Sequence, residues 1–202
     1  MSRLSGVALC SAFVLLLVIT ALAVKVGEPA PGFASIDSTG KTQSLSDYRG
    51  KFVVLEWHNQ GCPYTRKHYE SGNMQQLQKK WTERGVVWLT VISSAPGTQG
   101  FVTPTQENEY VQKMKASPTA VLMDPGGTLG RLYGAKTTPH MFIIDPQGTL
   151  IYQGAIDDRP TSDLKDIAGA KNYVDAALSE AMDKKAVTEA ATRPYGCSVK
   201  YK

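Results

Sequence analysis

Short apolar runs and longer amphipathic segments alternate along the chain. Phe52–Trp57 and Val86–Ile92 are rich in β-branched and aromatic residues, which is typical of strands that are buried on both faces of a sheet. Between them, Tyr64–Arg84 has apolar side chains at helical spacing, and Ser71-Gly72-Asn73 is a sequence that interrupts helices. The pattern therefore predicts a strand, an interrupted helix and a second strand, in this order.

The rest of the chain has the same kinds of signal. Thr103–Gln106 has the form of a capping box with proline in the first turn, and it predicts a helix that reaches Met114. The other predicted elements are a β-hairpin from Phe33 to Leu45, a strand at Thr119–Met123, a short helix at Thr128–Tyr133, a second hairpin made of His140–Ile144 and Leu150–Gln153, a helix that begins near Ser162, and a helix at Asn172–Lys185. Strands that alternate with helices, followed by a late antiparallel hairpin, predict an α/β fold. We expect a three-layer sandwich around a central mixed β-sheet, with an N-terminal β-hairpin.

The first 23 residues have the pattern of an export signal. No charged residue occurs from Leu4 to Val24, Arg3 supplies a positive flank, and Ala21–Ala23 has the small-residue spacing that signal peptidase accepts. The uncharged run is also long enough for a membrane-spanning helix, so an uncleaved N-terminal anchor is the alternative. Either outcome predicts an exported domain at residues 24–185, in the periplasm or another extracytoplasmic compartment, followed by a tail at residues 186–202.

Composition and charge exclude several classes of protein. With 42% hydrophobic and 20% charged residues, the chain of 202 residues is neither collagen-like nor wholly disordered, and it is not a multi-pass membrane protein. Its net charge of +4 comes from scattered positive residues, which argues against nucleic-acid binding. Three cysteines are too few for a disulfide scaffold. Removal of residues 1–23 takes Cys10 away and leaves Cys62 and Cys197 in an oxidising compartment.

Cys62 stands where a buried strand gives way to a helix. Pro63 suits the first helical position, so the sulfur of Cys62 is expected beside unpaired N–H groups and the positive end of the helix dipole. Such a position lowers a cysteine pKa from about 8.5 into a range of roughly 3.5 to 7.5. Arg66 and Lys67, one turn later, add positive potential. Cys62 is therefore a candidate nucleophile, and the alternative is a buried, inert cysteine.

Five segments of the chain match the pattern of one family. They are Gly27–Phe33, Leu45–Lys51, the Cys62-Pro63 turn, Leu132–Gly134 and Thr138–Asp145. On these segments the chain resembles exported members of the thioredoxin-like superfamily, in the redoxin (AhpC/TSA) branch that also contains the peroxiredoxins. The resemblance covers nearly the whole exported part. It implies a thioredoxin-like fold in which Pro139 follows a cis peptide bond and packs against the redox cysteine.

The departures from the family pattern bear on the reaction. Thioredoxins have a second cysteine at the position of Thr65, so no local dithiol can form here, and Thr65 can only donate a hydrogen bond. Peroxiredoxins have a proline, a threonine and an arginine where this chain has Leu55, Asn59 and Pro139. The resemblance therefore implies a thiol-disulfide oxidoreductase. The alternative is an atypical peroxiredoxin, an antioxidant enzyme that reduces hydroperoxides through Cys62.

Cys197 is the other cysteine of the exported part. Pro194 and Gly196 permit a turn that brings the tail back over the domain, so Cys197 is expected to resolve Cys62 by forming a reversible disulfide bond. A permanent bridge between the two cysteines would stabilise the fold by about 4–5 kcal/mol in the chain-entropy model, and pairing between two molecules is also open. A second class of function is therefore a non-catalytic binding module with a structural disulfide.

Neither a metal nor a cofactor is predicted. The spacing of His58, His68 and His140 fits no usual zinc pattern, and a copper site like that of redoxin-related copper chaperones needs a cysteine where this chain has Arg66. His140 or His58 is a candidate to tune or deprotonate Cys62, with a structural histidine as the alternative, and His68 is expected on a solvated helix face. The predicted partners are protein thiols or disulfides or a thioredoxin-type reductant, and a membrane only through the N-terminal anchor. The candidate catalytic residues are Cys62, Cys197, Pro139, Thr65 and His140.

Overall fold

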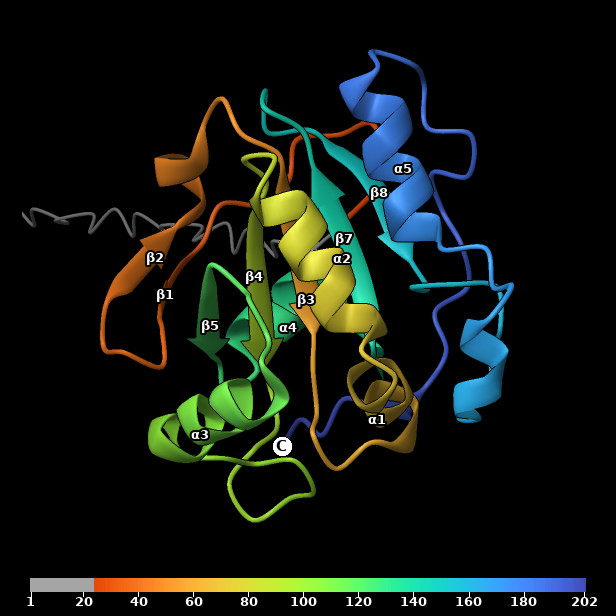
Figure 1. The fold of residues 1–202 in the computed structure, drawn as a ribbon. Helices are drawn as coiled ribbons and strands as arrows, with labels where there is room; N and C mark the ends of the chain where they lie inside the picture. Colours follow the sequence, from red (N-terminus) through yellow and green to blue (C-terminus); the bar gives the residue numbers. More distant parts are fainter. Residues whose placement is uncertain (1–23) are drawn as a thin grey trace, which may run out of the picture.

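A five-stranded mixed sheet lies at the centre of the computed structural model, which describes residues 24–202. The strands are β5 (Ala120–Met123), β4 (Val87–Ile92), β3 (Val53–Trp57), β7 (His140–Ile144) and β8 (Leu150–Gly154), in this spatial order (Figure 1). β3, β4 and β5 are parallel, whereas β7 is antiparallel to both β3 and β8. The predicted mixed sheet is confirmed.

Helices on both faces of the sheet complete three layers. The helices α1 (Pro63–Glu70), α2 (Asn73–Thr82) and α5 (Tyr173–Met182) lie in front of the sheet in Figure 1, and α4 (Thr128–Tyr133) lies behind it. Other elements are α3 (Pro104–Met114) near β5, the hairpin of β1 (Ala34–Ile36) and β2 (Thr42–Ser44), and 3₁₀ helices at Leu45–Tyr48 and Leu164–Ile167. The predicted α/β sandwich and its N-terminal hairpin are both confirmed.

The core divides into two main clusters, one on each face of the sheet. Every residue of β3, β4 and β7 is buried, as the continuous apolar runs predict. Trp57 belongs to the cluster on the α4 side, and Trp81 and Trp88 belong to the cluster beneath α2 and α5. All three tryptophans are fully buried core residues. This packing fixes the end of β3, and with it the turn that leads to Cys62.

Local signals set the helix boundaries that matter for the site. Gly72, with φ of +77°, separates α1 from α2, so the break expected at residues 71–73 is present. The capping box at Thr103 is formed, with reciprocal hydrogen bonds between Thr103 and Gln106. The helix expected near Ser162 is only one 3₁₀ turn, Leu164–Ile167, in which no residue is buried.

Two polar segments pack more closely than their composition indicates. Within Ser93–Val102, which reads as a flexible loop, Ser93 and Ala95 are buried and the Ala95 N–H donates to the Lys200 carbonyl at 2.9 Å. The polar tail also returns to the domain, because β9 (Cys197–Ser198) pairs with β6 (Thr137–Thr138) and Val199 enters the core. Both segments are ordered because they form hydrogen bonds and contacts with distant parts of the chain.

The signal peptide or anchor predicted for residues 1–23 lies outside the described residues, and so does Cys10. Among the helices formed by residues 24–202, none combines the length and the apolar character that crossing a membrane requires.

Candidate active site

Cys62 caps the N-terminal end of α1. The chain leaves β3 at Trp57, turns through a loop in which Cys62 N–H donates to the Asn59 carbonyl at 3.0 Å, and enters the helix at Pro63. Cys62 is fully buried. The sulfur therefore lies where the first-turn N–H groups and the helix dipole stabilise a negative charge.

The peptide bond between Thr138 and Pro139 is cis, as the family resemblance implies. It joins β6 to β7, and β7 is paired with β3 so that His140 lies opposite Trp57. This arrangement brings the residue before the proline to the end of α1. The thiol of Cys62 donates to the carbonyl oxygen of Thr138 at 3.1 Å.

The tail brings Cys197 to the same place. In the antiparallel pairing of β6 with β9, Cys197 stands opposite Thr138. Cys62 and Cys197 lie close enough for each thiol to shift the pKa of the other. Within residues 24–202 both cysteines are free thiols, Cys62 buried and Cys197 partly exposed. The two cysteines that the sequence proposed as a redox pair are therefore neighbours in space.

The two thiols have opposite electrostatic environments. Burial raises the pKa of Cys62, but hydrogen bonds from Cys197, from Thr138 and from the backbone N–H of Thr65 outweigh it, so the net pKa is lowered. Burial together with the adjacent Cys62 raises the pKa of Cys197 to about 11. Of the pair, Cys62 is thus the one that ionises first, which is the asymmetry that a nucleophile and its partner thiol require.

Thr65 occupies the third position of α1, at the place where thioredoxins have their second cysteine. Its side chain is buried, and its hydroxyl has no hydrogen-bond partner among the described residues. The contribution of Thr65 to Cys62 is made by the backbone N–H. The hydroxyl of Thr138 is also buried beside Cys62.

The histidines do not reach Cys62. His140 is buried against Phe142, and its Nδ1 accepts from the Lys136 N–H at 3.2 Å. His58 is buried between Tyr69 and Tyr110, and burial lowers the pKa of each of these two histidines to about 3. No hydrogen bond in the described part of the chain joins either ring to the sulfur. Both rings are neutral near pH 7, and His140 has the hydrogen bond of a structural histidine whereas His58 has none among the described residues.

The expectation for His68 was wrong. Its ring is fully buried on α1, where Nε2 lies 3.3 Å from the Tyr195 hydroxyl and Nδ1 lies 2.9 Å from the Asn73 amide nitrogen. A helix face that looks solvated in the sequence is covered here by the returning tail, which composition does not reveal.

The positions where peroxiredoxins hold their peroxide-binding residues have other roles. Leu55 is a core residue of β3. The Asn59 side chain is used within the loop, because it accepts from the Gly61 N–H at 2.8 Å and donates to the Gln99 carbonyl at 3.2 Å. Pro139 offers no side-chain donor. None of these three residues is arranged to polarise a peroxide O–O bond beside Cys62.

A buried carboxylate cluster that was not predicted lies beneath the site. Glu56 accepts from the Tyr69 hydroxyl at 2.8 Å and from the Trp88 indole N–H at 2.8 Å, and burial raises its pKa. Burial and the nearby Glu56 raise the pKa of Glu107 to about 8. One oxygen of Glu107 and both ring nitrogens of His58 are buried without a hydrogen-bond partner among the described residues. The available signal was Glu56 itself, a charged residue inside an otherwise apolar strand.

Substituting Glu107 by glutamine is expected to change how stability depends on pH. Because the folded-state pKa of Glu107 is raised, its stabilising contribution is complete below the unfolded value near 4.5 and is lost as pH rises through about 8. Relative to Glu107→Gln, the wild type should lose on the order of 2–3 kcal/mol of unfolding free energy between pH 5 and pH 8. Urea unfolding at several pH values measures this difference.

The wild type has to be compared with a variant because the three buried histidines change the free energy of unfolding with pH in the opposite direction to Glu107. Burial lowers the pKa of His58, His68 and His140 to about 3, so they favour the folded state as pH rises toward their unfolded value. Glu109→Gln, an exposed position on the same helix, is the matched control. Parallel pH profiles for the wild type and Glu107→Gln would show that Glu107 is ionised in the folded protein.

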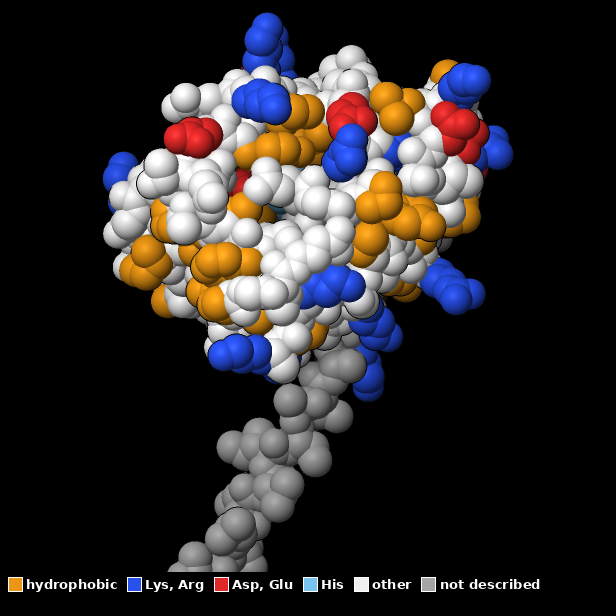
Figure 2. All heavy atoms as spheres, turned by 90° about the horizontal axis from the view of Figure 1, so that it is seen from below, with side chains coloured by type: hydrophobic (Ala, Val, Ile, Leu, Met, Phe, Trp, Pro, Cys, Tyr) orange, Lys and Arg blue, Asp and Glu red, His pale blue; other side chains and the backbone are white. Residues whose placement is uncertain are grey.

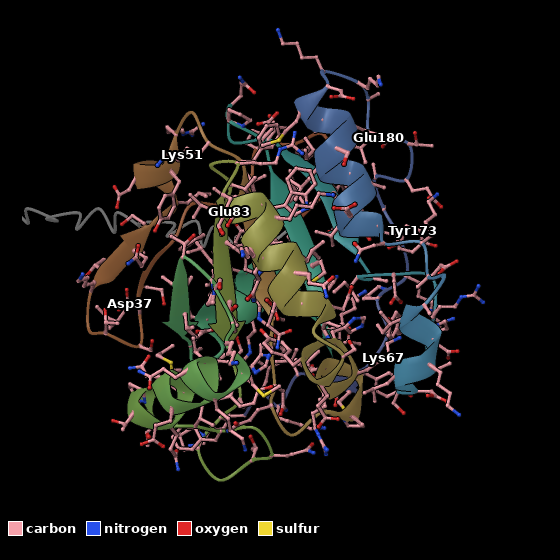
Figure 3. All side chains as sticks on the ribbon, viewed as in Figure 1. Asp37, Lys51, Lys67, Glu83, Tyr173 and Glu180 are labelled. Carbon is pink, nitrogen blue, oxygen red and sulfur yellow. The ribbon has the colours of Figure 1, made fainter. Side chains whose placement is uncertain are left out.

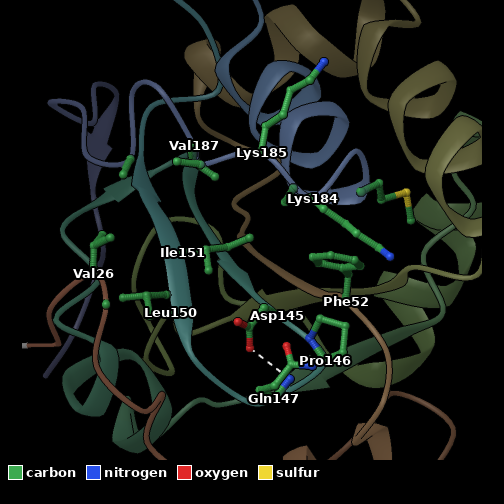
Figure 4. Close-up of a pocket in the computed structure, with 15 residues that line it drawn as sticks. Val26, Phe52, Asp145, Pro146, Gln147, Leu150, Ile151, Lys184, Lys185 and Val187 are labelled. Atoms are coloured by element: carbon green, nitrogen blue, oxygen red, sulfur yellow. Dashed lines mark hydrogen bonds between the residues drawn. The ribbon is translucent and has the colours of Figure 1, made fainter.

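Two pockets flank the domain. One, of about 670 Å³, is lined by Phe52, Ile151 and Lys184 (Figure 4). Phe52 precedes β3 and Cys62 follows it, so this pocket lies at the other end of the strand from Cys62. The other, of about 560 Å³, is lined by Thr137 and Tyr195 and lies beside the cysteine-bearing tail. Seen from the end of the molecule that is lowest in Figure 1, charges of both signs are scattered over the surface (Figure 2). Residues 24–202 hold no group of three or more His, Cys, Asp or Glu residues arranged for a metal ion.

Comparison with known proteins gives consistent results. The model of the AhpC/TSA family matches residues 26–153. The thiol-disulfide oxidoreductase ResA of Bacillus thuringiensis subsp. konkukian is 30% identical over 132 residues, which cover 64% of this chain and 69% of ResA. Cys197 lies beyond the segment that the family model matches.

Solved structures extend the comparison to the fold. A structure described as that of a candidate thiol:disulfide interchange protein DsbE from Chlorobium tepidum is 29% identical, with a TM-score of 0.53, and the match covers 65% of this chain and 85% of that one. An uncharacterized conserved protein from Geobacillus kaustophilus has a TM-score of 0.77 at 22% identity, with 88% and 93% of the two chains covered. The second match shows the shared fold alone, and it extends over more of the chain than the first.

Proposed function

The chain belongs to the AhpC/TSA family, and on that basis we propose that it is an exported thiol-disulfide oxidoreductase in which Cys62 is the nucleophile and Cys197 the resolving cysteine. The observation that carries the proposal is the pairing of β9 with β6, which holds Cys197 against the sulfur of Cys62 at the start of α1. The export part of the proposal rests on the signal pattern of residues 1–23.

The first step is attack by the Cys62 thiolate on a protein disulfide. A new bond forms between the Cys62 sulfur and one substrate sulfur, the substrate S–S bond breaks, and the second substrate sulfur leaves as a thiolate that takes up a proton. The N-terminal end of α1 and the hydrogen bonds that lower the pKa of Cys62 favour the thiolate that this step consumes.

The second step is attack by Cys197 on the Cys62 sulfur of the mixed disulfide. It forms the Cys62–Cys197 bond and releases the other substrate sulfur as a thiol, so two electrons pass from the protein to the substrate. The charge on Cys62 contributes to the raised pKa of Cys197. Because the mixed disulfide has no such charge, formation of the mixed disulfide itself makes Cys197 easier to deprotonate.

Access to Cys62 requires the tail to move. The sulfur is fully buried, and Cys197 is paired opposite Thr138, the residue whose carbonyl accepts from the Cys62 thiol. A protein disulfide can therefore reach Cys62 only when the segment around Cys197 opens, and the same segment must close again for the second step. The proposed partners are accordingly protein disulfides on exposed, flexible segments and a thioredoxin-type reductant that restores the two thiols.

Two oxidants compared on one preparation test the proposal. The fully reduced protein, residues 24–202, is mixed separately with a cystine-bridged model peptide and with hydrogen peroxide, and oxidation of Cys62 is followed by quenched-flow mass spectrometry. We expect the rate constant for the disulfide to exceed that for peroxide by at least about 100-fold, because no group beside Cys62 polarises an O–O bond. The product of the disulfide reaction should be the Cys62–Cys197 bond.

Other results would assign other functions. A peroxide reaction faster than the disulfide reaction would identify an atypical peroxiredoxin in which Cys197 resolves a sulfenic acid. Slow reaction with both oxidants, unchanged in a Cys62→Ser variant, would identify a non-catalytic module.

A further inference from the structure

The hydroxyl of Tyr195 lies in a buried polar cluster, two residues before Cys197. It donates to Asp157 Oδ1, and it lies 3.3 Å from both Lys67 Nζ and His68 Nε2. Lys67 Nζ also lies 3.6 Å from Asp157 Oδ2 and donates to the Arg159 carbonyl at 2.8 Å. The side chains of Lys67 and His68 are fully buried, and that of Asp157 is almost so.

The hydrogen bonds of the cluster use the whole capacity of the Tyr195 hydroxyl. The Asn73 amide donates to His68 Nδ1 at 2.9 Å, so the proton of this neutral ring is on Nε2 and points to Tyr195. Tyr195 therefore donates one hydrogen bond, to Asp157, and accepts two, from Lys67 and His68. A hydroxyl has one donor and two acceptor sites, and here all three are filled.

The cluster joins three segments that are distant in sequence. Lys67 and His68 belong to α1, Asp157 follows β8, and Tyr195 belongs to the tail. Figure 3 shows Lys67 on α1, on the side that faces the segment after β8. The Tyr195 ring also packs edge-on against Tyr64, with centroids 5.9 Å apart. A buried ion pair is a weak source of net stability, and its best-attested use is to select one arrangement of the chain.

We infer that Tyr195 is a positioning residue that holds Cys197 against Cys62, an inference that rests on the proposed function of the two cysteines. Cys62 caps α1, and the cluster partners Lys67 and His68 stand one turn further along the same helix. Tyr195 thus fixes the tail to the element that carries the nucleophile. It favours the second step, in which Cys197 must reach the Cys62 sulfur, and it opposes the first, in which the tail must open.

Tyr195→Phe separates these effects, because it removes the hydroxyl and keeps the ring. Resolution of a Cys62 mixed disulfide with a small aromatic thiol, followed by stopped-flow release of that thiol, is expected to slow about tenfold. Alkylation of Cys62 by iodoacetamide, measured in a Cys197→Ala background that has no side-chain donor at position 197, is expected to show the same thiol pKa with and without the Tyr195→Phe change. In the presence of Cys197, the same change should raise that pKa, since Cys197 is a hydrogen-bond donor to Cys62.

The matched control is Tyr133→Phe, which removes a hydroxyl that donates to the Pro31 carbonyl at 2.7 Å and not to the tail. This control should retain the wild-type resolution rate. If Tyr195→Phe resolves as fast as the control, Tyr195 does not position Cys197, and the proposed function is untouched. If the wild type itself never forms the Cys62–Cys197 bond from the mixed disulfide, the proposed function fails instead. Lys67→Met is a second variant that should slow resolution in the same way.

Discussion

Cys62→Ser is expected to abolish disulfide exchange, with a loss of at least about 1,000-fold, because a serine hydroxyl is not ionised at neutral pH and does not attack a disulfide. Cys197→Ser should stop the reaction one step later. The Cys62 thiolate still attacks the substrate disulfide, but no second thiol adjoins it to release the product. Mass spectrometry of the protein after mixing with a model peptide disulfide should therefore find unmodified Cys62→Ser, a trapped peptide adduct on Cys197→Ser, and a reduced peptide with the wild type.

A variant at Cys197 also reports on the acidity of Cys62. Hydrogen bonds from the thiol and the backbone N–H of Cys197 are among the causes that lower the pKa of Cys62. Cys197→Ala, which leaves no side-chain donor at this position, should move the inflection of the alkylation rate upward, toward the ordinary cysteine value of about 8.5. The control is Ser198→Ala, the exposed neighbour of Cys197 on β9. Exchange that persists in Cys62→Ser, or an adduct found on Cys197 in place of Cys62, would reverse the assigned order of attack.

Much of the fold could be predicted from sequence because its signals are local. Apolar runs marked the central strands, the Thr103 capping box marked the start of α3, and glycine in the left-handed region at Gly72 marked the break between α1 and α2. The position of Cys62 is equally local, since a strand end, a proline and a helix follow one another within a few residues. The prediction of a cis bond before Pro139 came from family resemblance, because the residues around Pro139 carry no physical signal for it.

The polar interior could not be predicted because it depends on which segments meet. Lys67 and His68 are polar residues of α1 that the tail and the segment after β8 cover, and the tail itself reads as polar and extended. The pairing of β6 with β9, between segments that are about sixty residues apart, brings Tyr195 to that helix face, and Asp157 reaches the same face from the segment after β8. Helical spacing describes one element at a time, so it cannot show a partner that arrives from elsewhere.

The tail depends on Gly196, where the backbone leaves no room for a side chain. This glycine has φ of +132°, a conformation that residues with a Cβ rarely adopt. A Cβ built there would lie 2.1 Å from the Thr138 carbonyl oxygen and 2.8 Å from its carbon, both main-chain atoms that cannot rotate away. The same carbonyl accepts the hydrogen bond of the Cys62 thiol. A methyl group at position 196 would therefore disturb both the pairing of β9 with β6 and the hydrogen bond of the Cys62 thiol.

Gly196→Ala is accordingly expected to detach β9 from β6 and to slow resolution of the Cys62 mixed disulfide by about 1,000-fold or more. The magnitude follows from the loss of orientation: a thiol on a flexible segment acts at an effective concentration of roughly millimolar, whereas a well-oriented group reaches effective molarities many orders higher. Stopped-flow release of the aromatic thiol measures the rate. Alkylation of Cys62 above its pKa should become faster at the same time, because the sulfur is no longer covered.

The matched control is Gly85→Ala, which also has positive φ, at +85°, but has no atom within 4 Å of the added Cβ. Its cost is backbone strain alone, about 1 kcal/mol of unfolding free energy, with wild-type resolution. Near-ultraviolet circular dichroism should show an intact tryptophan core in both variants, since Trp57, Trp81 and Trp88 lie in the two central clusters. Resolution in Gly196→Ala at the rate of Gly85→Ala would mean that the pairing of β9 with β6 does not deliver Cys197 to Cys62, and that the two thiols meet by another movement of the tail.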